Sequence, residues 1–313
     1  MSTTIPSAAR LVCRALSAAA LAALVSGCVI NGDKYKRPRD LEDGYEVNRL
    51  RLLAIRPEPP EAVPGEMVTF EVLIADPDEV VETVIWLACP LTASGDFGCN
   101  VDLDALGDDP TPEDLAAAGV IGIEPLFPPQ YVPDEALLEG LDDTEVQEGV
   151  SVIIQILAFP AAEQDAEEID FGEVAVGFKR LLVSEAITPN RNPEVAEFLV
   201  GGAVIPEDAI VAVEPGLEYT LGVRLEADSV ESYQYLNSEG TIEDRVEQPY
   251  VTWYAAGGHV SEPWGLYGRF GDDPLLEGRW IAPENVGAQG TWYGVVRDRR
   301  GGMAWVVQDW LVQ

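Results

Sequence analysis

Side chains suited to nucleophilic catalysis are scarce in this sequence of 313 residues. Its one histidine, His259, lies in the stretch GGHVSEPWG, and no serine occupies the Gly-x-Ser-x-Gly pattern of a nucleophile elbow. The paired glycines lack the lysine or the following helix of a phosphate-binding loop. We therefore expect His259 to be an ordinary loop histidine, and the chain to have no catalytic residue and no cofactor.

Carboxylates, in contrast, are abundant. The chain has 55 Asp and Glu residues against 19 Lys and Arg residues, which gives a net charge of −36. Two carboxylates can hydrolyse a glycosidic bond, but so many acids form countless pairs and spacing singles out none of them. A carbohydrate-active or other carboxylate-dependent hydrolase is therefore kept as the alternative function. The charge also repels phosphate backbones, so we expect no nucleic-acid partner, and it keeps the protein soluble without any ligand.

Calcium is the metal that these acids would suit best. Asp102, Asp104, Gly107 and Glu113 occupy the first, third, sixth and twelfth places of an EF-hand loop. An apolar residue occupies another ligand place, prolines interrupt the loop, and no flanking helices are evident. The acids at 76–79 could also bind calcium loosely at a strand end, although an exposed turn explains them as well. We therefore assign no metal-ligating residue.

The first 27 residues have the pattern of an export signal. Arg10 and Arg14 form a positively charged start, and residues 15–25 form an apolar run far shorter than the roughly 20 residues of a membrane-spanning helix. Ser26 and Gly27 are the small residues that a signal peptidase requires before its cut. An ordinary secretory signal would explain these features but would leave the next residue, Cys28, without a role.

The sequence Val25-Ser26-Gly27-Cys28 resembles the lipobox of bacterial lipoproteins. This resemblance covers residues 1–28 and implies that Cys28 is lipidated and becomes the new N-terminus, anchored in the membrane by its acyl chains. Val29 follows the cysteine where aspartate would favour the inner membrane, so the resemblance implies the outer membrane, on its periplasmic or surface face. Residues 28–47 are polar and aperiodic, and we expect them to be a flexible tether.

Two cysteines remain once Cys13 leaves with the signal and Cys28 takes the lipid. They are Cys89 and Cys99, in ACPLTASGDFGC, and the export signal places them in an oxidising compartment. Two thiols without nearby histidines cannot complete a tetrahedral zinc site. We predict a disulfide between Cys89 and Cys99, closing a short loop.

From residue 48 onward, apolar residues alternate as they do in half-buried strands. The pattern divides into residues 48–186 and 187–313. In each part a Pro-Gly turn, at 64–65 and 215–216, precedes a strand and then a strand with a tryptophan, Trp86 or Trp253. Each strand has an apolar face to bury, which favours two packed sheets in each part, each behaving as a separate folding unit. We predict an all-β protein of two β-sandwich domains related by an internal repeat.

One stretch, residues 90–149, is too long for an ordinary strand connection. Thr111 suits an N-cap, Pro112 a first helical position and Gly119 a helix end, so we predict a short helix there and a second within PDEALLEG. We therefore expect the first sandwich to carry a long, partly helical insertion.

Aromatic residues are dense after residue 250. Trp253 and Trp305 lie in alternating stretches and are expected in a core. Trp264 and Tyr267 lie in the irregular segment SEPWGLYGRFGDD, where they could stack on sugar rings or cover the edge of a core; we favour the second reading.

The strand layout and the final hairpin, VVRDRRGGMAWVV with its turn at 299–302, resemble the immunoglobulin-like and PKD-like domains of bacterial surface proteins. The resemblance spans residues 48–313 and implies a non-enzymatic, lipid-anchored envelope protein that acts as a scaffold or an adhesive binding surface. Its partners would be the membrane, through the anchor, and an envelope protein or polysaccharide.

Overall fold

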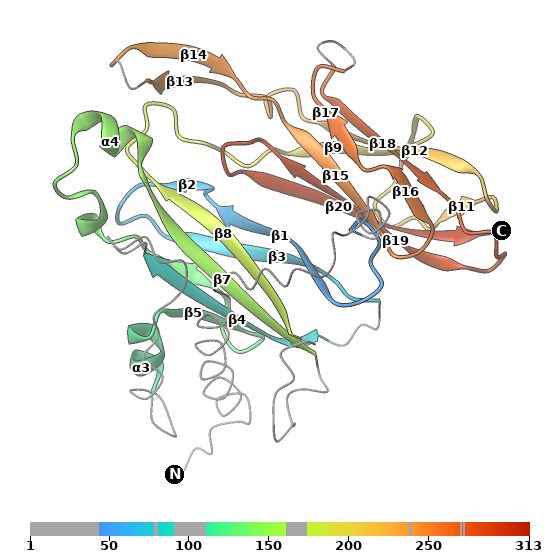
Figure 1. The fold of residues 1–313 in the computed structure, drawn as a ribbon, viewed down its shortest axis with the longest axis horizontal. Helices are drawn as coiled ribbons and strands as arrows, with labels where there is room; N and C mark the ends of the chain where they lie inside the picture. Colours follow the sequence, from blue (N-terminus) through green and yellow to red (C-terminus); the bar gives the residue numbers. More distant parts are fainter. Residues whose placement is uncertain are drawn as a thin grey trace, which may run out of the picture.

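The fold is known from a computed structural model, which describes residues 44–77, 81–90, 111–160, 174–237, 240–269, 271 and 273–313. The chain forms two β-sandwiches, a first module and a second module, as the sequence predicts (Figure 1). No helix in these ranges is both long and apolar enough to cross a bilayer.

The first module packs a small sheet against a larger one. The small sheet has the order β1-β3-β6, formed by β1 (Arg51–Glu58), β3 (Val68–Ala75) and β6 (Gln130–Tyr131). The larger sheet has the order β2-β8-β7-β4-β5, formed by β2 (Glu61–Ala62), β8 (Ala175–Val183), β7 (Val150–Pro160), β4 (Val81–Pro90) and β5 (Val120–Glu124).

The second module packs two five-stranded sheets and adds a separate hairpin. One sheet has the order β10-β9-β12-β18-β16, formed by β10 (Ala203–Ile205), β9 (Val195–Val200), β12 (Glu218–Leu225), β18 (Leu275–Ile281) and β16 (His259–Glu262). The other has the order β11-β20-β19-β15-β17, formed by β11 (Val211–Val213), β20 (Met303–Val312), β19 (Gln289–Arg297), β15 (Tyr250–Ala255) and β17 (Trp264–Leu266). The hairpin joins β13 (Ser232–Leu236) to β14 (Ile242–Val246).

The two modules use the same strand pairings. Antiparallel β1 and β3 correspond to β9 and β12, the parallel pair β2 and β8 to β11 and β20, and the series β4-β7-β8 to β15-β19-β20. Gly65 and Gly216 have φ values of 82° and 67° in the two equivalent turns, a conformation that favours glycine. Trp86 and Trp253 are fully buried on the equivalent strands β4 and β15, as expected.

The core of the second module is built on tryptophan. Trp280 packs against Trp292 and Trp310 with ring centroids 4.9 Å apart in both cases, and Trp253 is buried beside them. Glycine on the next strand provides the space, because a Cβ at Gly294 would lie only 2.7 Å from Cζ3 of Trp253. Large indole rings and facing glycines therefore depend on each other in this core.

The larger sheet of the first module is buried on both faces. Trp86 and Ile154 face β1 and β3. Ile85 and Leu87 lie on the opposite face of the sheet, where they pack with Leu115. Leu115 belongs to α3 (Pro112–Ala117), so a helix forms a third layer over part of this sheet. This double burial explains the nearly continuous apolar runs of β4 and β7.

The stretch 90–149 differs in part from expectation. Thr111 caps α3 and Pro112 stands in its first turn, as predicted, and the PDEALLEG segment forms the short 3-10 helix η2 (Glu135–Leu138). A further short helix, α4 (Asp143–Glu148), follows. The same stretch also supplies β5 and β6 to the two sheets, so its described part belongs to the sandwich instead of being set apart from it. The sequence did not predict β5 and β6, because alternation of apolar residues over such short strands is a weak signal of a strand.

The modules share an apolar interface, so they are not the separate units that their repeat suggests. Its buried members come from both modules and from the segment before them: Val47, Leu53, Ala54, Leu73, Ala75, Tyr293, Val295 and Met303. The end of the predicted tether belongs to this interface. Val47 donates its N–H to the carbonyl of Ala255 at 2.8 Å, which adds residues 45–47 to the edge of the second module.

Candidate functional site

The loop between β19 and β20, residues 298–302, brings a largely buried arginine side chain, 14% exposed, to the junction of the modules. Arg300 donates to Glu247 Oε1 at 3.0 Å and to the carbonyl of Thr188 at 2.7 Å. Its guanidinium also lies 3.4 Å from Glu61 Oε2 and 3.5 Å from Glu231 Oε2. Glu61 belongs to the first module and Thr188 to the connection, so one side chain links both modules and the segment between them.

Asp298 holds this loop in place. Its Oδ1 accepts from the backbone N–H of Arg300 at 2.7 Å and of Gly301 at 2.9 Å, and its Oδ2 accepts from Nδ2 of Asn190 at 2.7 Å. Lys179 of β8 in turn donates from Nζ to the carbonyl of Gly301. An aspartate that binds the following backbone N–H groups is a common feature of tight turns. Here Asp298 also binds Asn190 in the connection, and Lys179 joins the turn to the first module.

We define the charge cluster as Glu61, Lys179, Glu231, Glu247, Asp298 and Arg300. Burial raises the pKa of Glu247 to about 7, with the charge of Asp298 adding to the effect and Arg300 opposing it. Burial also raises the pKa of Asp298 and lowers that of Lys179 to about 8. Perturbed carboxylates can mark catalytic sites, but buried ion-pair networks produce the same shifts.

The geometry favours a structural role for the cluster. A pocket of about 220 Å³ lies beside it, lined in part by Glu61, Tyr233 and Arg300, but neither Glu247 nor Asp298 is among its lining residues. The oxygens of those two acids accept hydrogen bonds from Arg300 and from backbone N–H groups instead. These two acids therefore hold Arg300 and its loop in place at the junction of the modules.

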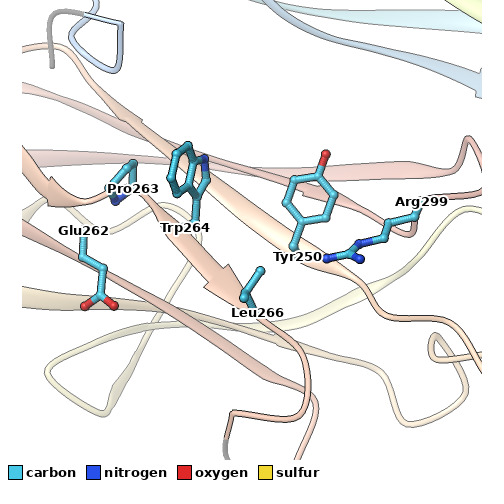
Figure 2. A pocket seen from close by; sticks show the side chains of 6 residues that line it. All are labelled: Tyr250, Glu262, Pro263, Trp264, Leu266 and Arg299. Atoms are coloured by element: carbon cyan, nitrogen blue, oxygen red, sulfur yellow. The ribbon is translucent and has the colours of Figure 1, made fainter. Parts of the chain in front are cut away.

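A second candidate site lies on the outer edge of the second module. Trp264 and Leu266 of β17 are 55% and 50% exposed, and they lie beside Tyr250 of β15 and the exposed Arg299 (Figure 2). Together with Glu262 and Pro263 they line an open pocket of about 740 Å³. Trp264 and Leu266 share a face of β17 because alternate residues of a strand point the same way. Aromatic, apolar and cationic side chains thus lie together on the exposed edge of the second module.

Arg299 has an unusual backbone for this position. Its φ is 74°, the left-handed region that non-glycine residues seldom adopt, and the guanidinium carbon lies 5.6 Å from the ring centre of Tyr250. The hydrogen bonds of Asp298 to the next residues hold the turn in this shape. The turn therefore places the largely buried Arg300 in the junction and directs Arg299 to the open pocket.

The residues singled out from sequence have different outcomes. His259 begins β16, half-exposed, with Nδ1 3.8 Å from Glu46 Oε1. Trp264 is exposed, whereas Tyr267 packs against the core as expected. Trp305 is half-buried beneath Arg56, whose guanidinium carbon lies 4.9 Å from the ring centre.

The predicted lipid and disulfide sites fall mostly outside the described residues. Cys28 and Cys99 lie outside them, while Cys89 is buried near the end of β4, so the lipid attachment and the Cys89–Cys99 pairing stay predictions.

The calcium candidates are divided in the same way. Asp102, Asp104 and Gly107 lie outside the described residues, and Glu113 is exposed in the first turn of α3. Within the ranges that the structure describes, no three His, Cys, Asp or Glu side chains are grouped to hold a metal ion.

Sequence reasoning missed Arg300, Glu247 and Arg299. The only local signal was the RDRRGG turn, in which an aspartate precedes paired glycines, and this pattern does not reveal which distant acids the arginine meets.

Comparison with known proteins finds no matching protein family and no matching curated sequence. Among solved structures, the chain is similar to dimeric latent PorU from Porphyromonas gingivalis (12% identity, TM-score 0.23), covering 85% of this chain and 24% of that one. It is also similar to fibronectin(III)-like modules of CbhA from Clostridium thermocellum (11%, 0.22; 83% and 94% covered). A third similarity is to a protein from Corynebacterium diphtheriae described as membrane anchored (11%, 0.23; 85% and 59% covered). The chain thus spans about a quarter of PorU, and at these scores the fold assignment rests on the strand pairings above.

Proposed function

We propose that this protein is a non-enzymatic, lipid-anchored protein of the cell envelope whose two immunoglobulin-like modules act together as a scaffold or adhesive binding surface. The observation that supports this proposal is the junction, where an apolar interface and the charge cluster join the modules into one unit. A firmly joined pair of sandwiches presents its loops and edges in a constant arrangement, which suits binding of an envelope protein or a polysaccharide. The lipobox resemblance supports attachment through Cys28 to the outer membrane.

The anchor is tested by expressing the full chain in a bacterium with an outer membrane and labelling its lipoproteins with a fatty-acid analogue. The wild-type chain should take up label and sediment with outer-membrane fractions, and Cys28→Ser should lose both properties. Cys13→Ser is the matched control, because it removes a thiol from the same leader and should change neither. Equal labelling of Cys28→Ser would overturn the lipoprotein proposal.

One observation favours the alternative, a carboxylate-dependent hydrolase: the pKa of Glu247 is raised to about 7 near a second carboxylate, Asp298. The wild-type chain should nevertheless release no sugars from isolated envelope polysaccharides. Release that disappears in Glu247→Gln, while the variant stays folded by circular dichroism, would establish the hydrolase and refute a purely structural role for the charge cluster.

A further inference from the structure

An exposed patch of membrane-compatible side chains lies where the N-terminal segment leaves the fold. We define this edge patch as Tyr250, Trp264, Leu266 and Arg299 (Figure 2). Of the seven tryptophans in the chain, Trp264 is the one that is more than half exposed; five are fully buried and Trp305 is half-buried. An indole and a leucine side by side on a short edge strand are costly to leave in water.

The segment around Tyr45, which leads back to Cys28, is held next to the edge patch. The ring of Tyr45 meets Trp264 edge-on, with centroids 5.8 Å apart and planes at 88°. Ala255 donates its N–H to the carbonyl of Tyr45 at 3.0 Å, which holds the segment on β15. Residues 29–44 alone separate Tyr45 from Cys28. Even fully extended, a chain of that length reaches at most about 58 Å, so a lipid on Cys28 would limit the distance between Trp264 and the bilayer.

The local charge of the edge patch differs from that of the whole protein. Arg299 is exposed and forms no ion pair with any residue that the structure describes. The acid that lines the same pocket, Glu262, is paired with Arg269 at 2.7 Å and with Arg279 at 3.3 Å. On a chain with a net charge of −36, such an uncompensated cation marks a place that can approach lipid phosphates while most of the surface is repelled.

We propose that the edge patch contacts the phospholipid headgroups of the membrane that holds Cys28. This contact fixes the orientation of the protein relative to that membrane. This inference rests on the proposed lipid anchor. Tryptophan and tyrosine favour the headgroup region, leucine enters the acyl boundary, and arginine binds phosphate. The contact is small and weak by itself, but a tether of this length gives an effective concentration on the order of mM, at which a weak contact is occupied.

Tryptophan fluorescence tests this proposal directly. The acylated full chain is reconstituted into vesicles of phosphatidylethanolamine and phosphatidylglycerol, with or without lipids that carry a nitroxide on the headgroup. The nitroxide should quench a minor, red-shifted part of the emission, and Trp264→Phe should abolish this quenching. Trp305→Phe is the matched control and should keep it, and Arg299→Gln should reduce it.

The possible failures are distinguishable. A chain that takes up no acyl label refutes the lipid anchor itself. A labelled, vesicle-bound chain whose emission is insensitive to the headgroup nitroxide, or equally quenched in Trp264→Phe, refutes the edge patch as a membrane contact. A Trp264 emission shift on adding envelope polysaccharide, without nitroxide quenching, would assign the patch to sugar binding instead.

Discussion

Replacing Arg300 with methionine is the sharpest test of how the modules are joined. The substitution keeps a long apolar stem and removes the guanidinium that contacts Glu61, Glu231 and Glu247. The side chains of Glu61 and Glu247 are only 5% and 1% exposed, so water cannot replace the lost partner. Leaving a buried charge without its partner costs about 3–5 kcal/mol, and we expect the free energy of unfolding at pH 8 to fall by that amount.

The pH dependence of the free energy of unfolding provides a second, independent test. Because burial raises the pKa of Glu247 from 4.5 to about 7, the folded state binds a proton more tightly than the unfolded state between these values. The stability contribution of this group is therefore present at low pH and lost as pH rises through about 7. Without Arg300 the pKa should rise further. The penalty of Arg300→Met should accordingly be smaller at pH 5.5 than at pH 8.

Urea unfolding followed by circular dichroism at both pH values measures these quantities. Arg299→Met, one residue away and exposed, should change stability by less than about 0.5 kcal/mol. Adding Glu247→Gln to Arg300→Met should recover part of the loss, because it removes an unpaired charge. A loss below about 1 kcal/mol at pH 8, or an equal loss at both pH values, would refute the assignment of the charge cluster as the link between the modules.

Three further outcomes are expected. Trp253→Ala should cost about 3–5 kcal/mol by urea unfolding, and limited proteolysis should also accelerate within residues 48–186, because the modules share an interface; unchanged cleavage there would show that the interface does not couple them. Gly294→Ala should lower the thermal midpoint more than Gly222→Ala, because the new Cβ would lie 2.7 Å from an indole carbon instead of 3.3 Å from a movable leucine methyl group; equal midpoints would contradict this reasoning. Mass spectrometry of the unreduced protein should find Cys89 linked to Cys99, and complete alkylation of both without reductant would disprove the pairing.

Much of the fold was predictable because its signals are local. The Pro-Gly turns, the alternating strands and the capping residue Thr111 each depend on neighbours within a few positions, and each occurs where the sequence places it. The final hairpin is likewise formed by β19 and β20 around residues 298–302. The prediction that the tether extends to residue 47 was wrong for its last residues. Their polar character gave no sign of the backbone hydrogen bonds that join them to β15.

The candidate sites depended on contacts between residues far apart in the chain. Sequence alone determined that the protein is an acidic double sandwich with buried Trp86 and Trp253. It could not determine that Glu61 and Arg300 meet, because any of 55 acids could pair with any arginine and most charges simply face water. It also could not separate exposed Trp264 from packed Tyr267, which share one irregular segment. Only the tertiary structure decides such cases, since burial depends on which surfaces meet when the modules pack.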